Sequence, residues 1–357
     1  MGSPLRQQIR FCRAADGARL AWATSGDGPP LVKASNWISH LECDLQSPVW
    51  GHLVDELSSR HRLVRYDQRG CGLSDRDAGD HGLETWVSDL ERVVDAAGLE
   101  QFPLLGISQG AAIAVAYAAR HPGRVTHLVL HGGFARGRLR RATTPEMREE
   151  AALMPRLAEI GWGRGNDAWR QFFTTQFIPR GGPEQHRWFN ELQRVSAAPA
   201  TAAAIMRATD VVDIVDRLPE VRCPTLVLHA TGDARVPFDQ GRLLASAIPG
   251  ARFAPVEGCN HLLLPDEPGW ARWVEEFRAF LPAAAPLAEQ FGGLTPRELA
   301  LLDLIATGRD NAQIAATLAL REKTVRNHVT NIYAKLQVAN RAQAVVMARE
   351  AGLGIAA

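Results

Sequence analysis

The stretch FPLLGISQGAAIAVAY, residues 102–117, decides the fold of this 357-residue chain. Its first part, Phe102–Ile107, is almost entirely apolar and predicts a buried strand. The run of small residues that begins at Ala111 predicts a helix that can approach a sheet closely. Between them Gly106–Gly110, GISQG, is a G-x-S-x-G turn whose glycines permit a sharp change from strand to helix. The stretch therefore predicts a strained turn that exposes the hydroxyl of Ser108.

Apolar runs alternate with helical stretches from residue 8 to residue 280, which is typical of a mainly parallel α/β sheet. The candidate strands are Pro30–Ala34, Arg62–Tyr66, Phe102–Ile107, Val125–Leu130, Pro224–His229 and Ala251–Val256. The alternation stops over residues 135–217, where Trp and Phe recur at helical spacing. Such an aromatic stripe is more often core than ligand pocket, but an insertion at this point is where a helical lid over a site is expected.

A nucleophilic serine needs a base, and the base needs an orienting acid. In this strand-turn-helix geometry the expected chain order is Ser, Asp, His. Asp233 and His261 satisfy that order, and each follows the carboxyl end of a candidate strand, where α/β sheets place their ligands. Asp213 and Asp239 remain alternatives to Asp233 as the acid.

Residues 8–280 resemble the serine α/β-hydrolase family. Besides the G-x-S-x-G turn, Asp16-Gly17 and Gly26–Pro30 are similar to the opening hairpin of that family, and Tyr66–Asp75 is similar to its strand-plus-loop signature. The resemblance implies an α/β-hydrolase fold, a mostly parallel sheet with a helical lid.

The same resemblance implies that Ser108 is the nucleophile, His261 the base and Asp233 the orienting acid of a catalytic triad. Acyl transfer to water is then the expected reaction, on an ester, lactone, thioester or activated amide. No metal or organic cofactor is implied.

An oxyanion hole requires two N–H donors. One should be the backbone N–H of Gln109, which follows the nucleophile. The other should come from the loop Ser35–His40, where many relatives carry His-Gly and this chain carries SNWISH. Asn36 or Trp37 is the candidate, because a backbone amide donates whatever its side chain is.

The last part of the chain has a different pattern. Thr295–Glu298, TPRE, is a capping box with proline at the first helical position. A second helix is predicted from Asp310 to Leu318 and a third over Glu322–Leu336. From Phe291 onward eight Lys or Arg residues face five Asp or Glu residues, so this end carries a local +3 in a chain of net charge +1. The asymmetry favours nucleic acid as a partner of this end.

The third predicted helix is amphipathic. Its apolar residues fall three or four apart and should face a core; they are Val325, Val329, Ile332 and Leu336. The opposite face offers side chains that can hydrogen-bond to base edges in a major groove; they are Lys323, Arg326, Asn327 and Thr330. A solvated charged face is the alternative interpretation.

Residues 293–354 closely resemble the LuxR-type helix-turn-helix family. The matching residues are Leu294–Glu298, Ile314-Ala315, Lys323–Val325, Asn327–Val329, Lys335-Leu336 and Ala342–Ala344. The resemblance implies base contacts from Arg326, Asn327 and Thr330. It also implies phosphate contacts from Thr324, Lys335 and Arg341.

Two further features of this module bear on its use. Arg321 stands where relatives usually have a serine that caps the third helix, and a missing cap costs about 1 kcal/mol. The last helix offers Ala344, Val345 and Ala348 as a small-residue face. Because such modules commonly pair on inverted half-sites, we expect a homodimer on double-stranded operator DNA.

The predicted organisation is a hydrolase domain over 1–281, a linker over 282–292 and a helix-turn-helix domain over 293–357. The five cysteines are scattered, odd in number and without C-x-x-C, which indicates reduced thiols. The longest apolar run is too short to span a bilayer. We therefore expect a cytoplasmic protein with no membrane partner.

Our first hypothesis is a transcriptional regulator whose hydrolase domain binds and hydrolyses a small acyl compound as its input, with slow turnover allowed. The second is a metabolic ester or lactone hydrolase whose DNA-binding domain controls its own pathway. The third is a non-catalytic ligand receptor that retains the triad. The fold alone does not choose between them, because function lies in the site.

Overall fold

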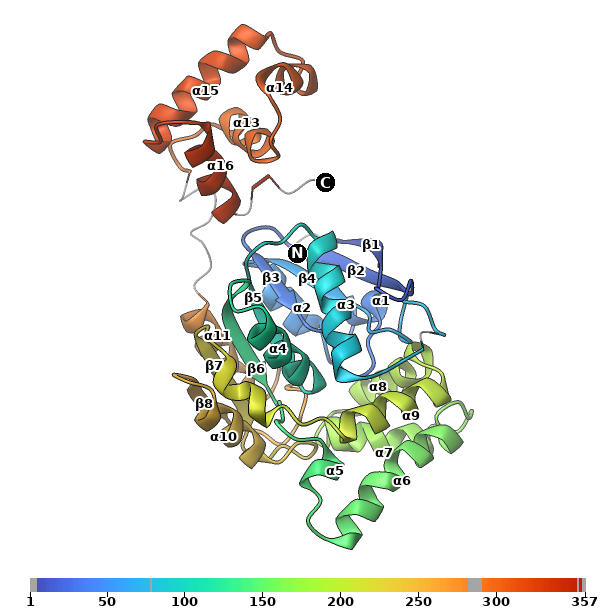
Figure 1. Cartoon of the computed structure of the whole chain (residues 1–357). Helices are drawn as coiled ribbons and strands as arrows, with labels where there is room; N and C mark the ends of the chain where they lie inside the picture. Colours follow the sequence, from blue (N-terminus) through green and yellow to red (C-terminus); the bar gives the residue numbers. More distant parts are fainter. Residues whose placement is uncertain (1–4, 78, 282–290, 352, 355–357) are drawn as a thin grey trace. The chain divides into compact units, whose positions relative to one another are not determined.

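The structure, a computed structural model, describes residues 5–77, 79–281, 291–351 and 353–354 (Figure 1). Its internal contacts divide the chain into two compact units, the larger of which ends at Leu281. The predicted linker falls mostly outside the described residues, since 282–290 are not among them. Each unit is described by itself.

The larger unit is built on an eight-stranded sheet in the order β1-β2-β4-β3-β5-β6-β7-β8. The strands are β1 (Gln7–Arg13), β2 (Arg19–Ser25), β3 (Pro30–Lys33), β4 (Arg62–Tyr66), β5 (Phe102–Ile107), β6 (Val125–His131), β7 (Thr225–Ala230) and β8 (Arg252–Val256). From β3 through β5, β6 and β7 to β8 all pairings are parallel, whereas β1–β2 and β2–β4 are antiparallel. The predicted mainly parallel sheet is confirmed.

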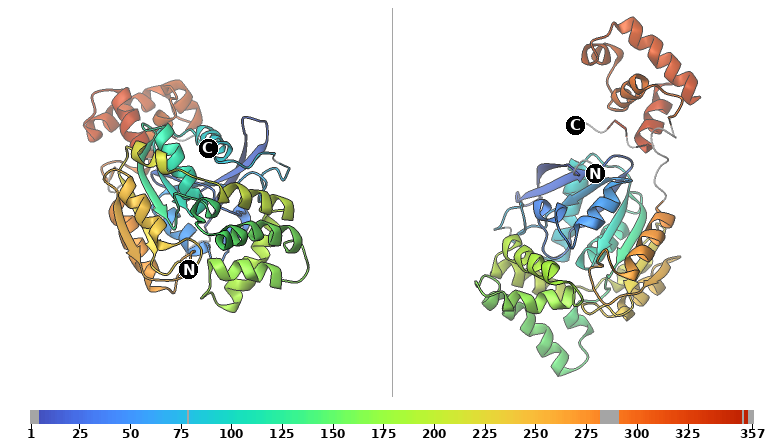
Figure 2. Two further views of the ribbon diagram at one scale, coloured as in Figure 1. Left: turned by 60° about the horizontal axis from the view of Figure 1, so that its bottom comes forward. Right: turned by 180° about the vertical axis from the view of Figure 1, so that it is seen from behind.

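Helices cover both faces of this sheet. They are α1 (Leu41–Leu45), α2 (Gly51–Ser58), α3 (Leu83–Ala96), α4 (Gln109–Arg120), α10 (Phe238–Ala247) and α11 (Pro268–Phe280). In the view of Figure 1, α3 and α4 lie in front of the sheet, and α2 and α11 come forward when the molecule is seen from behind (Figure 2). Every residue of α4 from Gln109 to Ala118 is buried, which explains the small side chains of this helix.

The insertion between β6 and β7 is helical, as predicted. It consists of α5 (Arg138–Arg141), α6 (Pro145–Gly161), α7 (Ala168–Phe177), α8 (Pro183–Ser196) and α9 (Pro199–Asp210), and the 3₁₀ turn Val215–Glu220 leads back to β7. These helices gather at one end of the larger unit (Figures 1 and 2). Most of the aromatic side chains of the insertion form its core, because Trp162, Phe173 and Phe189 are each 1% exposed.

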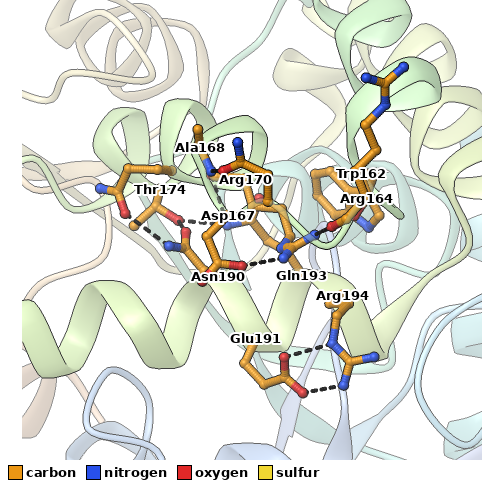
Figure 3. Close-up of polar contacts among 12 residues, drawn as sticks. Trp162, Arg164, Asp167, Ala168, Arg170, Thr174, Asn190, Glu191, Gln193 and Arg194 are labelled. Atoms are coloured by element: carbon orange, nitrogen blue, oxygen red, sulfur yellow. Dashed lines mark hydrogen bonds and ion pairs between the residues drawn. The ribbon is translucent and has the colours of Figure 1, made fainter.

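A buried polar network joins α7 to α8 and to the segment that precedes α7 (Figure 3). The guanidinium of Arg170, a residue only 2% exposed, donates to the carbonyls of Trp162 at 2.8 Å and Arg164 at 2.6 Å. The side chain of Gln193 donates to the hydroxyl of Thr174 at 2.6 Å. These bonds supply partners for polar groups that are costly to bury alone.

The smaller unit contains α13 (Pro296–Ala306), α14 (Asn311–Thr317), α15 (Glu322–Leu336) and α16 (Arg341–Glu350). Capping boxes at Thr295 and Asp310 start the first two of these helices, as the sequence predicts. Ala344 and Ala348 are fully buried in the core of this unit, where α16 packs on α13. The predicted small-residue face therefore packs inside the domain, and the expected homodimer stays a prediction.

No helix among the described residues is long and apolar enough to cross a bilayer.

Candidate catalytic and DNA-binding sites

Ser108 lies at the tip of the turn between β5 and α4. Its φ of 55° and ψ of −122° are strained for a residue other than glycine, and such strain clusters at functional sites. The turn is tight on both sides. A Cβ on Gly106 would lie 2.6 Å from Cα of Ala111, and one on Gly110 would lie 2.7 Å from the carbonyl oxygen of Ser35. Glycine is therefore required at both positions, as the motif predicts.

His261 and Asp233 form a buried pair. Nδ1 of His261 lies 2.7 Å from Oδ2 of Asp233, and both side chains are fully buried. The other oxygen of Asp233 accepts the backbone N–H groups of Arg235 at 2.8 Å and Val236 at 2.9 Å. Burial works to raise the pKa of Asp233, but attraction to His261 and these hydrogen bonds outweigh it and lower the pKa, so the carboxylate stays ionised.

The two alternative acids lie elsewhere. Asp213 pairs with Arg136 at 3.4 Å, and the side chain of Asp239 is 84% exposed on α10. It is Asp233 that contacts the imidazole.

Gly132 lies between the serine turn and the imidazole. The N–H of Ser108 donates to the carbonyl of His131 at 2.9 Å, and a Cβ on the following Gly132 would lie 3.0 Å from Cε1 of His261. Glycine at this position lets the ring approach the end of β6. Nε2 of His261 is buried and makes no hydrogen bond to Ser108 or to any other described residue.

The loop after β3 lies against the start of α4. The carbonyl of Ser35 faces Gly110, and Trp37 lines the same pocket as Ser108 and Gln109. The first N–H groups of a helix have no intrahelical partner, and Gln109 is the first residue of α4. The structure thus brings both candidate sources of oxyanion donors to Ser108.

Asp67 anchors the segment that follows the loop after β3. Its carboxylate accepts the N–H groups of Leu41 at 3.0 Å and Leu73 at 2.8 Å, which ties the end of β4 to the segments on either side. Burial raises the pKa of Asp67 to about 6. This accounts for the strand-plus-loop signature at Tyr66–Asp75.

The lid touches both halves of the site. The ring of Phe177, at the end of α7, stacks on Trp37 with centroids 4.9 Å apart. The carbonyl of Phe177 accepts the N–H of His261 at 2.8 Å. A displacement of α7 would therefore change the contacts of Phe177 with both the candidate oxyanion loop and His261.

The pocket beside Ser108 is about 450 Å³, open mouth included. Its lining includes Phe177 and three arginines that sequence reasoning missed, Arg138, Arg141 and Arg235. Two of them lie in the lid, and the sequence does not indicate which side chains of the lid face the pocket. Arg235 follows Asp233 by two residues, so its place near the site could have been predicted. Within the described residues, no cluster of three or more His, Cys, Asp or Glu is arranged to hold a metal ion.

The second candidate site is the outer face of α15. Val325, Val329 and Ile332 are buried in the core of the smaller unit, as their spacing predicts. The opposite face is exposed to solvent and carries Lys323, Arg326, Asn327 and Thr330. The structure therefore brings together the four side chains proposed to face the bases, and Thr324 lies beside them, partly buried.

The other predicted phosphate contacts are engaged within the domain. Nζ of Lys335 lies 2.7 Å from a carboxylate oxygen of Glu298, and the Arg341 guanidinium donates to the side chain of Asn311 at 3.3 Å. Arg321 is the N-cap of α15, and its side chain makes no cap hydrogen bond.

Known proteins resemble both units. Residues 46–268 match the family model for the alpha/beta hydrolase fold, and residues 293–348 match the model for bacterial regulatory proteins of the luxR family. The protein RutD of Azorhizobium caulinodans, whose name assigns it as a carbamate hydrolase, is 32% identical over 59% of this chain and 78% of its own length.

Solved structures agree for the larger unit. The esterase EaEST from Exiguobacterium antarcticum has a TM-score of 0.66 at 24% identity, covering 76% of this chain and 99% of its own. A thermophilic esterase from Thermogutta terrifontis has a TM-score of 0.61 at 26% identity, covering 76% of this chain and 97% of its own. The chain therefore belongs to the alpha/beta hydrolase family and carries a C-terminal DNA-binding domain of the LuxR type.

Proposed function

We propose that this protein is a transcriptional regulator whose hydrolase domain binds and hydrolyses a small acyl compound as its input. One observation carries the proposal. A strained, pocket-lining Ser108 and a buried Asp233–His261 pair occur in the same chain as a solvent-exposed polar and basic face on α15. The relatives are hydrolases and esterases, which favours a carboxylic ester, lactone or thioester as the compound.

In the first half of the proposed reaction, Oγ of Ser108 attacks the substrate carbonyl while Nε2 of His261 takes the hydroxyl proton. Asp233 holds the ring through Nδ1 and stabilises the imidazolium that forms. The negative oxygen receives hydrogen bonds from the N–H of Gln109 and from that of Asn36 or Trp37. The intermediate then collapses, and His261 returns the proton to the departing alkoxide or thiolate.

The second half regenerates the enzyme. A water molecule gives a proton to Nε2 of His261 and attacks the acyl-enzyme carbonyl. When this intermediate collapses, the carboxylic acid leaves and the proton returns to Oγ of Ser108. No cofactor takes part in either half.

On the DNA side, α15 enters a major groove, with Arg326, Asn327 and Thr330 directed at base edges. Phosphate contacts from Thr324 and Lys335 fix its register. A homodimer would present two such helices to inverted half-sites.

The test is treatment of the purified full-length chain with a fluorophosphonate, followed by mass spectrometry of its peptides. We expect an adduct on Ser108 that is lost in His261→Ala. The matched control is Ser246→Ala, because Ser246 is exposed on α10 and should leave labelling unchanged. The rate of short-chain ester hydrolysis is then compared between the labelled and the unlabelled protein. Hydrolysis by the unlabelled protein alone shows turnover at Ser108 and not only binding. Absence of both labelling and turnover would refute the catalytic proposal and favour a receptor.

A further inference from the structure

The pocket beside Ser108 holds more positive than negative charge. Arg138, Arg141 and Arg235 line it, and Asp210 is the carboxylate among its lining residues. Arg138 and Asp210 form a two-bonded pair, with Nε to Oδ1 at 2.8 Å and Nη2 to Oδ2 at 2.9 Å. That pair is neutral, so the charges of Arg141 and Arg235 are left over.

Arg235 has no carboxylate within ion-pair distance in the described part of the chain. Its guanidinium donates to the neutral side chain of Gln176 at 2.9 Å and lies over the ring of Phe177 at 5.3 Å. Asp233 is close in sequence, but its two oxygens are occupied by His261 and by the backbone N–H groups of residues 235 and 236. The five donors of a guanidinium are thus only partly used.

Arg141 is in a similar position. One of its nitrogens donates to the carbonyl of Arg136 at 2.7 Å, and no carboxylate lies within ion-pair distance of it among the described residues. Burial is the main cause that lowers the pKa of both Arg141 and Arg235, that of Arg235 to about 9, while Arg138 lowers and Asp210 raises the pKa of each. An anion bound between the two would favour the charged form of both guanidinium groups.

We infer that this pocket selects an acyl compound that carries a carboxylate, which Arg235 and Arg141 bind while Ser108 faces the scissile carbonyl. The inference rests on the proposed function and narrows it to anionic substrates, such as the monoesters of dicarboxylic acids or lactones with a free acid. Guanidinium suits this task because its planar fork matches the two oxygens of a carboxylate. The ring of Phe177 and the other apolar lining accommodate the hydrocarbon between the two groups.

Arg235 has an alternative role as a latch between the segment after β7 and the lid, through Gln176 and Phe177. A latch would affect charged and uncharged substrates alike. The ratio between matched substrates therefore separates the two roles, whereas activity alone does not.

The experiment compares kcat/KM for monomethyl succinate, glutarate and adipate with kcat/KM for methyl butyrate, pentanoate and hexanoate, followed by pH-stat. At the best chain length we expect the anionic ester to be preferred about tenfold to hundredfold, mainly through KM. In Arg235→Gln the ratio should fall towards one, and in Arg235→Lys part of it should remain. The matched control is Arg242→Gln, because the Arg242 side chain is 67% exposed on α10 and should leave the ratio unchanged.

A binding measurement keeps this inference separate from the proposed catalysis. Calorimetry on Ser108→Ala with monomethyl glutarate and with dimethyl glutarate needs no turnover. Tighter binding of the monoanion, lost in the double variant with Arg235→Gln, supports the inference even if fluorophosphonate labelling fails. Equal binding of the two esters, binding of neither, or a substrate ratio that Arg235→Gln leaves unchanged would overturn it, and labelling of Ser108 would still stand.

Discussion

At the scale of single residues, the contact between Asp233 and His261 determines how the imidazole is used. Replacing Asp233 by Asn removes the charge that stabilises the imidazolium and favours the wrong tautomer, so kcat for ester hydrolysis should fall by about 10³–10⁴. Steady-state rates on a chromogenic ester measure this. Asp239→Asn is the control, since Asp239 is exposed on α10 and lies away from the ring. If Asp233→Asn kept the rate of the control variant, His261 would take its orientation from another group.

In the smaller unit, the contacts of Glu298 stabilise the start of α13. Its carboxylate accepts from Lys335 and from the N–H of Thr295, and these bonds lower the pKa of Glu298 to about 2. A lowered pKa means that the contribution to stability is complete above the ordinary value of 4.5 and is lost as the pH falls towards 2.

We therefore predict that Glu298→Gln destabilises α13 by about 0.2–1 kcal/mol at neutral pH, because glutamine can still accept the N–H of Thr295 but loses the charge that pairs with Lys335. It should also remove the dependence of α13 stability on pH below 4.5. Hydrogen exchange of the α13 amides, corrected for the intrinsic rate at each pH, measures both effects. Glu322→Gln is the control, because Glu322 is exposed and pairs with Arg326 one turn away.

The candidate triad could be predicted from the sequence because its chemistry fixes chain order and position after a strand, two properties that a sequence displays. The surplus of positive charge around Arg235 could not be predicted. It depends on which arginines already pair with a carboxylate. Arg138 pairs with Asp210, which is 72 residues away in the sequence, and no local pattern indicates such a contact.

At the scale of elements, α15 lacks the cap that starts its neighbours. Replacing Arg321 by Ser supplies a hydroxyl for the free N–H groups of the first turn and should stabilise α15 by about 1 kcal/mol, measured by hydrogen exchange. If Arg321 also contacts phosphate, the same variant weakens operator binding and reduces the slope of log affinity against log salt by about one. An unchanged exchange rate would show that the backbone at this N-cap does not accept the serine geometry.

The lid network predicts a contrast between two arginines of Figure 3. Arg170→Met leaves the carbonyls of Trp162 and Arg164 without donors, at a cost of about 1–3 kcal/mol for each unsatisfied group. Arg194→Met removes an exposed pair with Glu191 on one helix and should change stability by less than about 0.5 kcal/mol. Hydrogen exchange over α7 and α8 measures the difference. Because α7 ends at Phe177, the first variant should also lower kcat/KM.

Elements were predictable where one physical signal decides them. Arg62–Tyr66, Phe102–Ile107 and Glu322–Leu336 have the bounds that hydrophobic pattern and turn residues predict. The alternation of apolar runs did not identify β1 as a strand. It lies at the sheet edge, its burial alternates between partial and exposed, and its sequence QQIRFCR has no apolar run. The sequence showed the small-residue face of α16 but not where it packs, because small residues suit a domain core and a dimer face equally.

At the scale of the whole molecule, the chain joins a hydrolase domain to a DNA-binding domain, and the proposal requires that the state of one alters the other. A ligand shifts only those equilibria whose two states it binds unequally. Occupancy at Ser108 must therefore change operator affinity, and by linkage operator DNA must change ligand affinity by the same factor.

The corresponding prediction is a change in operator affinity of about 5-fold to 150-fold when Ser108 is covalently labelled, the usual range of allosteric coupling. The operator is first selected from random duplex DNA, and affinity is then measured by fluorescence anisotropy at fixed salt, because phosphate contacts make it salt-dependent. Ser108→Ala treated with the same fluorophosphonate is the control, and it should bind as the untreated protein does. Equal affinity of labelled and unlabelled protein for the operator would show that the state of Ser108 does not control DNA binding. The chain would then be a hydrolase and a DNA-binding protein that share a polypeptide without a switch between them.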